Sequence, residues 1–437
     1  MDAVTDATGI SSPSGFPDLW THVPGHMAEP GAPSAELAAL SGGMSIEALC
    51  QDRKWTCPFT GDEITAAEGL DILALWQRRL ATMDKPLVCL GMSTWKRQTI
   101  VDFLHLPGTQ RPVFATSVPT ALAIANKRDA RIIVWSTKQK DDVEGKCRRA
   151  GVDLWRMEDG FVRSAGLGSN LVPACSHSID RTGIYYDGRN PSDLETAIAT
   201  DQHSDRMIER AKRLMALMVE KNVSKYSIGG EFVPHWQMGQ GKRVILVPGQ
   251  VSDDQSILTS AMFHDNLDFL KAVREAEPEA ILVYKPHPDV EAGNRQGRIA
   301  PDVAAEFADH VITDAPIGAV LSHVDEVQTQ TSLVGFEALL RGLPVTSWGM
   351  PFYAGWGLTR DKQAIVRRTR HIEIEHLVAS ALICYPYYRD PVTGLPCPVE
   401  IVIRRLEEGV AEPHGDKVMR RLRLAGLNLL RRVMIKG

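Results

Sequence analysis

The stretch Pro86-Leu-Val-Cys-Leu-Gly91 is a short apolar run with a glycine behind it, and residues 95–104 follow with helical spacing. This order predicts a strand that enters a helix. Further strand candidates lie at 112–115, 131–135 and 152–155, and a helix-like stretch at 141–150 separates the last two. Repeated strand-then-helix units predict a parallel sheet with helices on both faces.

A second series of strands follows a long polar helix predicted at 204–221 and a linker near 225–241. Its strand candidates are 243–247, 280–284, 310–312, 326–328 and 344–346. The chain is therefore predicted to be α/β, with two Rossmann-like domains facing each other across a cleft. The expected divisions are an N-terminal arm, partly mobile, at 1–80; the two domains at 81–225 and 226–370; and a C-terminal helical region with a basic tail at 371–437.

Composition places the chain among ordinary globular proteins. Of its 437 residues, 44% are hydrophobic and 24% charged, which excludes disorder, collagen and coiled coil for most of the length. The 49 Lys and Arg against 54 Asp and Glu leave a net charge of −5, so no overall field would attract nucleic acid. Nucleic-acid partners are not expected.

Cysteine use and hydropathy indicate the compartment. The seven cysteines are an odd number scattered through a long chain, which favours free thiols in a reducing compartment. Cys50 and Cys57 have no second Cys/His pair nearby, so a zinc site is a weak alternative. Residues 1–18 lack the pattern of a signal peptide, and no eighteen apolar residues run without interruption. A cytoplasmic location is expected, including the inner face of the cytoplasmic membrane.

Ligands in open α/β sheets bind beyond the carboxyl ends of the strands, so the loops that follow strands are the first candidates for a site. The loop after 152–155 contains the adjacent acids Glu158 and Asp159, Arg163 and three glycines. Such a loop can supply a nucleophile or a base, with its backbone close to a ligand. The alternative is an acidic surface turn with an arginine partner.

Two loops of the second series add polar and cationic residues. The segment 248–256 includes Gln250 among small polar side chains, which suit a sugar or phosphate or else a solvated loop with an Asp helix cap. In the segment Lys285-Pro-His287-Pro, a proline follows the lysine and another follows the histidine. Because proline fixes φ, this is a rigid cationic corner suited to a phosphate or a departing nucleotide; the alternative is a structural histidine.

The fourth loop follows the strand candidate 326–328. Thr331 and Ser332 sit where a helix is expected to begin, offering hydroxyls and free amide hydrogens to an anion, and Glu337 about one turn onward could reach a ribose. The alternative is a capping box without a ligand. The series of Ser/Thr, Gly, Glu-Ala and Gly-Leu-Pro-Val here resembles the donor-nucleotide site of GT-B glycosyltransferases.

Three segments in order resemble one family. They are Glu158-Asp-Gly-Phe-Val-Arg-Ser164, Lys285-Pro-His-Pro288 and Pro351-Phe-Tyr-Ala-Gly-Trp-Gly-Leu-Thr359. The acid pair and the His-Pro pair resemble motifs of bacterial sugar transferases with CMP-activated donors. Together the segments look like the capsule polysaccharide β-Kdo transferase family, the KpsC-like proteins, over about 85–397.

The resemblance implies a GT-B protein that transfers 3-deoxy-D-manno-oct-2-ulosonic acid (Kdo) from CMP-Kdo, with retention, to a glycan or glycolipid acceptor. The product would be part of a capsule or related surface polysaccharide. Residues 81–225 would then be the acceptor side and 226–370 the CMP-sugar side, with no cofactor besides the donor. Typical members resemble two such modules in tandem, whereas this chain holds one, which leaves the linkage open.

The candidate residues take roles from the same resemblance. Asp159 is the candidate nucleophile, by analogy with double displacement in retaining glycosidases, and Glu158 is the runner-up. Arg163 would pair with the Kdo carboxylate, because a guanidinium matches a carboxylate at two points. The other donor-binding candidates are Gln250, Lys285, His287, Thr331, Ser332 and Glu337. The cationic corner and the helix start would stabilise the leaving CMP without a metal.

Three further features have two interpretations each. Trp95 and Lys96 could reach the acceptor or pack as a helix start. The aromatic residues of 352–356 form either a stacking wall or part of the core. The tail 416–437 carries seven cationic residues among apolar ones, which suits contact with the inner membrane or export machinery, or else a helix packed on the other domain.

Two rival functions remain at this stage. A CMP-sialic-acid transferase would use the same nucleotide and a similar keto-acid carboxylate. A non-catalytic GT-B protein that binds glycan or scaffolds polysaccharide export would not need the acid pair and the cationic corner together, so their joint presence favours the enzyme.

Overall fold

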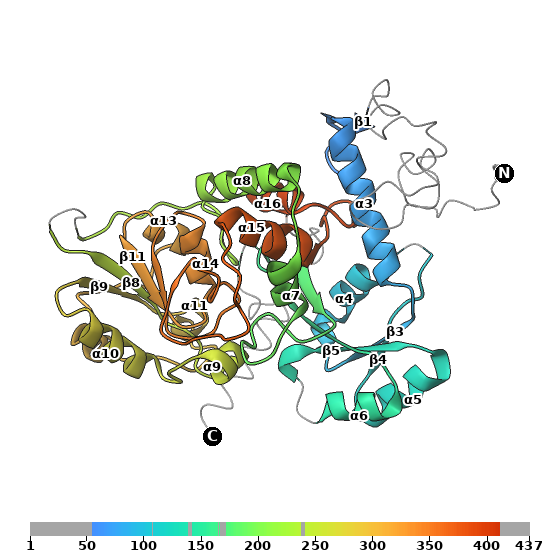
Figure 1. Ribbon diagram of the computed structural model, residues 1–437, viewed down its shortest axis with the longest axis horizontal. Helices are drawn as coiled ribbons and strands as arrows, with labels where there is room; N and C mark the ends of the chain where they lie inside the picture. Colours follow the sequence, from blue (N-terminus) through green and yellow to red (C-terminus); the bar gives the residue numbers. More distant parts are fainter. Residues whose placement is uncertain are drawn as a thin grey trace.

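The computed structural model describes residues 55–106, 108–138, 142–164, 166, 172–236 and 241–410. Within these ranges the chain forms two six-stranded sheets and a two-stranded hairpin. The two large sheets lie side by side with helices around them (Figure 1). The prediction of an α/β chain with two series of strands is confirmed.

The first sheet is parallel at its centre. Its parallel strands are β3 (Leu87–Leu90), β4 (Val113–Ala115), β5 (Arg131–Trp135) and β6 (Leu154–Asp159). The helices of this half are η2 (Thr94–Lys96), α4 (Arg97–Leu104), α5 (Val118–Arg128), η3 (Ser136–Lys138), α6 (Val143–Ala150) and α7 (Asp193–Thr200). Since α4 packs on one face and α5 and α6 on the other, every residue of β3 and β5 is buried. The predicted strands are confirmed within a few residues.

Two antiparallel strands extend this sheet, which the prediction of an all-parallel sheet missed. β7 (Ser176–Asp180) pairs antiparallel with β6, and β14 (Pro386–Tyr388) pairs antiparallel with β7. β7 is polar yet wholly buried, because its side chains bond inside the protein: Ser176 Oγ donates to the Val162 carbonyl at 2.5 Å. β14 comes from the region expected to be only helical, so the C-terminal part of the chain completes the first sheet.

The second sheet is parallel throughout. In spatial order its strands are β10 (His310–Val311), β9 (Ile281–Lys285), β8 (Val244–Pro248), β11 (Glu326–Thr329), β12 (Val345–Ser347) and β13 (Arg360–Asp361). Its helices are α9 (Gln255–Ser260), α10 (Asn266–Ala276), α11 (Pro288–Glu291), α12 (Pro301–Ala305), α13 (Ile317–Leu321) and α14 (Leu333–Leu339). α10 and α12 cover one face and α13 and α14 the other, so β8 is buried along its whole length.

The folded chain begins inside the region expected to be an arm. The hairpin of β1 (Trp55–Thr56) and β2 (Glu63–Ile64) leads into α3 (Ala66–Thr82), whose start is fixed by a capping box between Thr65 and Glu68. Trp76 of α3 is only 1% exposed and donates its indole N–H to the Pro396 carbonyl at 2.7 Å. Residues 1–54, including Cys50, lie outside the described residues, while 55–80 are a packed part of the fold.

Four helical segments join the two halves. They are α8 (Asp205–Glu220), which the sequence predicted, α15 (Ile374–Val378), the π-helix η5 (Ala379–Cys384) and α16 (Val399–Glu407). They lie together above the junction of the two sheets (Figure 1). The tail 416–437 lies outside the described residues. No helix among the described residues is long and apolar enough to cross a membrane.

Candidate functional site

The predicted acid pair closes β6, at the carboxyl end of the first sheet. Asp159 lies opposite His177 of β7, and Glu158 opposite Ser178. Three cationic or ionisable groups surround the Asp159 carboxylate: Arg163 Nε at 2.8 Å from Oδ2, Lys96 Nζ at 3.6 Å from Oδ1, and His177 Nδ1 at 3.7 Å from Oδ1. The acidic surface turn is thereby excluded as the explanation of this motif.

Asp159 is held as a carboxylate. Burial alone would raise its pKa, but the charges of Arg163, Lys96 and His177 outweigh burial and place the pKa far below its usual range. Its Oδ2 accepts a hydrogen bond from Arg163, while Oδ1 is buried without a hydrogen-bond partner. An unprotonated oxygen without a donor keeps its lone pairs available, as a nucleophile requires.

Glu158 is the opposite case, because its environment favours the neutral form. Burial, followed by the adjacent Asp159 charge, raises the pKa of Glu158 to about 7. Its Oε1 accepts the Asp159 backbone N–H at 3.2 Å and its Oε2 has no partner. Two neighbouring carboxyls with separated pKa values suit an anion and a proton carrier.

His177 and Lys96 complete the surroundings of Asp159. Sequence analysis missed His177, because β7 does not resemble a strand and nothing in the sequence pairs it with the acids. Burial lowers the pKa of His177 to about 3, so it is neutral at pH 7, and its ring packs edge-on against Phe103 at 4.4 Å between centroids. Lys96, predicted to reach an acceptor, lies 3.6 Å from the Trp135 ring centroid and shares a small hollow with Trp95, Asp159 and His177.

Arg163 is buried and bound to other groups of the protein. Its side chain is 1% exposed, and its guanidinium donates to Asp159 Oδ2 and, at 2.7 Å, to Ser164 Oγ. A guanidinium committed to these protein groups and closed off from solvent is not placed to receive a sugar carboxylate. Arg163 instead orients Asp159.

A linker turn connects this loop to the second half. The turn at 224–227 accepts the backbone N–H groups of Arg163 and Ser164 at the Lys225 carbonyl, at 3.3 and 3.4 Å. On its other side the Lys225 backbone N–H donates to Glu337 Oε1 at 3.1 Å. Sequence analysis treated this stretch only as a linker and missed Lys225.

The structure places Lys285 and His287 together at the end of β9. His287 N-caps the short α11, accepting the Asp289 N–H at Nδ1 at 3.1 Å, and burial lowers its pKa. Burial also lowers the pKa of Lys285, whose Nζ lies 3.4 Å from the Thr313 carbonyl. The charge of Lys225 acts on both His287 and the acid pair.

The polar residues at the end of β8 and β11 bind each other. Gln250 donates from Nε2 to Thr331 Oγ1 at 2.8 Å and accepts the Thr331 N–H at Oε1 at 3.1 Å. Ser332 N-caps α14 through Val334 N–H at 3.2 Å, as the capping alternative expected. Gln250 and Thr331 are thus brought together, and their polar groups bind each other.

Glu337 faces the linker turn, whereas a ribose contact was expected. It is 4% exposed; besides accepting from Lys225 at Oε1, it has a buried Oε2 without a hydrogen bond. Burial raises its pKa to about 7.

The aromatic residues of 352–356 belong to the core. Phe352 is 6% exposed, and Tyr353 and Trp356 are fully buried. Phe352 stacks on Phe161 of the acid-pair loop at 4.7 Å between centroids, and Tyr353 donates its hydroxyl to the Ser332 carbonyl at 2.6 Å. Of the two interpretations, the core is the one that the structure supports, and these residues brace the loops that carry the site.

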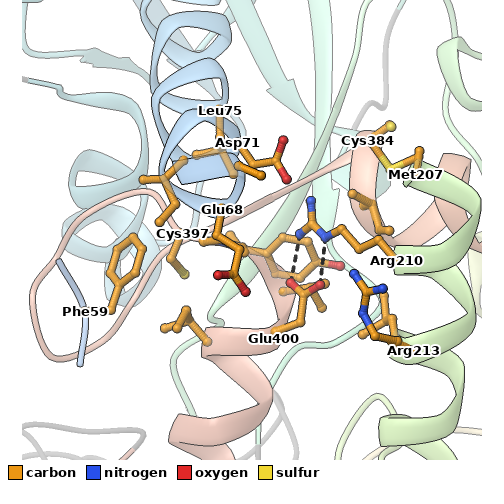
Figure 2. Close-up of a pocket in the computed structure, with 18 of the residues that line it drawn as sticks. Phe59, Glu68, Asp71, Leu75, Met207, Arg210, Arg213, Cys384, Cys397 and Glu400 are labelled. Atoms are coloured by element: carbon orange, nitrogen blue, oxygen red, sulfur yellow. Dashed lines mark hydrogen bonds and ion pairs between the residues drawn. The ribbon is translucent and has the colours of Figure 1, made fainter. Parts of the chain in front are cut away.

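A cavity of about 530 Å³ lies elsewhere, between α3, α8 and α16 (Figure 2). Its walls combine apolar side chains with a bidentate ion pair, in which Arg210 of α8 donates to both carboxylate oxygens of Glu400 of α16, each at 2.8 Å. None of the predicted site residues lines this cavity. Among the described residues, no group of three or more His, Cys, Asp or Glu is arranged to hold a metal ion.

Residues 130–388 match the sequence model of the family described as capsule polysaccharide biosynthesis protein. The chain belongs to this family. Both the acid pair and the cationic corner fall within the matched range. The expected KpsC-like resemblance is confirmed at this level.

This capsule polysaccharide biosynthesis protein has characterised relatives. The capsule polysaccharide modification protein LipA of Neisseria meningitidis serogroup A is 42% identical over 347 residues, covering 79% of this chain and 49% of LipA. The chain therefore spans about half the length of that relative. Two solved structures of Thermosulfurimonas dismutans KpsC are also similar, each covering 74% of this chain and 98% of the solved one. The structure titled beta Kdo 2,7 transferase is 33% identical with a TM-score of 0.60, and the one titled beta Kdo 2,4 transferase is 30% identical with a TM-score of 0.62.

Proposed function

We propose that this protein is a retaining β-Kdo glycosyltransferase of GT-B type, which moves Kdo from CMP-Kdo to a glycan or glycolipid acceptor of a capsule or related polysaccharide. The observation that carries the proposal is the Asp159 carboxylate, kept ionised by the charges of Arg163 and Lys96, with one oxygen that accepts no hydrogen bond from the described residues. The similarity to two structures titled as Kdo transferases supports the choice of sugar. The two sheets joined by a linker turn support the GT-B arrangement.

The proposed reaction has two displacement steps. In the first, Asp159 Oδ1 forms a bond to the anomeric carbon of Kdo while the bond from that carbon to the CMP phosphate oxygen breaks, and CMP leaves with the electron pair. In the second, an acceptor hydroxyl attacks the same carbon, Asp159 leaves, and Glu158 takes the hydroxyl proton. Two inversions give net retention.

The second half supplies the positive charge for the leaving group in this proposal. CMP departs as an anion, so cations and donors near its phosphate lower the barrier. Lys285 and His287 lie at the end of β9 and are buried enough for their charge or hydrogen bonds to act in a low dielectric. Gln250, Thr331 and Ser332 at neighbouring strand ends are the proposed polar contacts of the nucleotide.

The test is transfer by the purified protein with CMP-Kdo generated in situ and a panel of Kdo-terminated and lipid-linked acceptors, with products analysed by mass spectrometry and NMR. Asp159→Asn should lower kcat by about 10³-fold or more. Asp129→Asn is the control, because Asp129 is exposed and its φ of 48° suits Asn equally. A new β-linked Kdo supports the proposal; near-normal turnover of folded Asp159→Asn removes Asp159 from the nucleophile role.

The same assay separates the rival functions. Transfer from CMP-sialic acid and not from CMP-Kdo would assign the other keto-acid donor. CMP binding without transfer to any acceptor would point to a different donor or acceptor, and absence of CMP binding would favour a scaffold in polysaccharide export. Contact with the cytoplasmic face of the inner membrane is proposed from the tail sequence, and unchanged liposome binding after deletion of 416–437 would refute it.

A further inference from the structure

The backbone of Lys225 is fixed to both halves of the molecule. Its N–H is held by Glu337 of α14 at 3.1 Å, and its carbonyl holds Arg163 and Ser164 of the acid-pair loop. The next residue, Tyr226, accepts the Gly166 N–H at its carbonyl at 2.8 Å. The position of residue 225 relative to Asp159 is therefore set by hydrogen bonds on three sides.

Among the residues that the structure describes, the side chain of Lys225 has no ion-pair partner. Lys96 and Arg163 both pair with Asp159, whereas no carboxylate oxygen of the described residues lies within ion-pair distance of Lys225 Nζ. The ammonium lies 5.5 Å from the centroid of the Tyr226 ring. The residue as a whole is partly buried.

The charges that face this ammonium come from both halves. Burial would lower the pKa of Lys225, but Tyr185, Tyr226, Asp159 and Glu158 raise it above its usual range, so the side chain is a cation at every physiological pH. Its charge also acts on His287 across the linker turn. This cation thus acts electrostatically on both the proposed nucleophile and the proposed phosphate corner.

An anionic donor would need such a group. CMP-Kdo carries a phosphate and a sugar carboxylate, and each repels an attacking carboxylate in a low-dielectric site. We propose that Lys225 is a donor-binding residue, whose ammonium pairs with an anionic group of the sugar nucleotide beside Asp159, and that Glu337 positions it. This inference rests on the proposed function and assigns to it a residue outside the family-like motifs.

The experiment compares Lys225→Met, which keeps the length of the side chain and removes the charge, with Lys225→Arg, which keeps the charge. Lys212→Met is the matched control, because Lys212 is exposed on α8 and pairs only with Glu209. We expect Lys225→Met to lower kcat/KM for CMP-Kdo by about 30-fold or more, since it removes a charge partner of the donor, and Lys225→Arg to recover part of the loss. Wild-type kcat/KM in Lys225→Met would overturn the proposal, as would equal losses in both variants.

Binding of CMP alone, measured by calorimetry, identifies the anionic group. Weaker CMP binding by Lys225→Met assigns the phosphate, and unchanged CMP binding with a raised KM for CMP-Kdo assigns the sugar carboxylate; both support the proposal. A wild-type protein that neither binds CMP nor transfers Kdo would instead reject the proposed function.

A measurement on the wild-type protein covers the case in which Lys225→Met does not fold. Reductive methylation of lysines, quantified by mass spectrometry, should slow several-fold at Lys225 with saturating CMP or CMP-Kdo and stay unchanged at Lys212. Equal labelling of Lys225 with and without both ligands would overturn the proposal.

Discussion

Arg163 Nε lies 2.8 Å from Asp159 Oδ2, and the two residues are four positions apart in one loop at the end of β6. The guanidinium occupies one carboxylate oxygen and leaves Oδ1 without a hydrogen bond. Because the Arg163 backbone is itself bonded to Lys225, the direction of the free oxygen depends on how the two halves are joined. The orientation of the proposed nucleophile therefore depends on the contact between the two halves.

In a Glu158→Gln background, which removes the limb near pH 7, replacement of Arg163 by Met should move the remaining acid limb of activity. Without the guanidinium the pKa of Asp159 rises, and since an acid with a lowered pKa loses its contribution as pH falls through that pKa, the limb shifts to higher pH. We expect a stability loss of about 3–5 kcal/mol, because a buried charge loses its partner. The pH dependence of the rate checks the shift of the limb, and denaturant unfolding checks the loss of stability. Arg149→Met is the control, because Arg149 belongs to an exposed ion pair. An unmoved acid limb would contradict the assignment.

Ionisation of Glu158 should produce the rise of the pH–rate profile near pH 7, which is called the neutral limb here. As the proposed base it must be ionised, so kcat/KM should rise with pH to a plateau above an apparent pKa of about 7. Glu158→Gln should abolish that limb and lower the plateau by about 10²–10⁴-fold. Steady-state rates from pH 5 to 9 measure this, with Glu220→Gln, an exposed glutamate, for comparison. Persistence of the limb in Glu158→Gln would assign it to another group.

Glu337→Gln should stabilise the protein at alkaline pH. The pKa of Glu337 in the folded protein, about 7, lies above the 4.5 of an exposed glutamate, so wild-type stability falls as pH rises between these values. The amide keeps an oxygen for the Lys225 N–H and removes the buried charge, which predicts a gain of roughly 2–3 kcal/mol at pH 8 and little change at pH 4.5. Urea unfolding at both pH values is the measurement. An equal gain in stability at pH 8 and at pH 4.5 would show that ionisation of Glu337 is not the cause.

The Arg210–Glu400 pair should couple α8 to α16. Its two hydrogen bonds of 2.8 Å join helices from distant parts of the chain beside the cavity (Figure 2). A double-mutant cycle with Arg210→Met and Glu400→Gln should give a coupling energy of about 1–2 kcal/mol, since the pair is bidentate and only partly exposed. The exposed Lys212–Glu209 pair on the same helix should give less than about 0.5 kcal/mol. Equal coupling energies would mean that the bidentate geometry adds nothing.

The central parallel strands β3, β5, β8 and β9 could be predicted because most of their residues are apolar. β5 and β8 are buried on both faces, and burial on both faces requires apolar residues at every position. Their order along the chain then located the strand ends, and so the acid pair and the cationic corner. The roles of Arg163 and Glu337 could not be predicted in this way, because a sequence does not show whether a polar side chain faces a ligand or the protein.

The polar strand β7 and the position of Lys225 could not be predicted from the sequence either, because both depend on contacts between distant parts of the chain. β7 is buried by hydrogen bonds to partners remote in sequence, such as the Tyr385 hydroxyl that donates to Asp180 at 2.9 Å. Lys225 takes its position from helix α14 of one half and from the acid-pair loop of the other. Long-range pairing of this kind leaves no periodic pattern in the local sequence.

The pairing of β14 with β7 also bears on synthesis by the ribosome. About 200 residues separate the two strands, so at ordinary elongation rates β7 waits roughly 10–40 s for its partner. During that interval the first sheet has emerged with an unpaired edge, which is a template for association with other chains. Expression in cells should therefore depend on chaperones that cover nascent chains, and a fragment ending before Pro386 should aggregate.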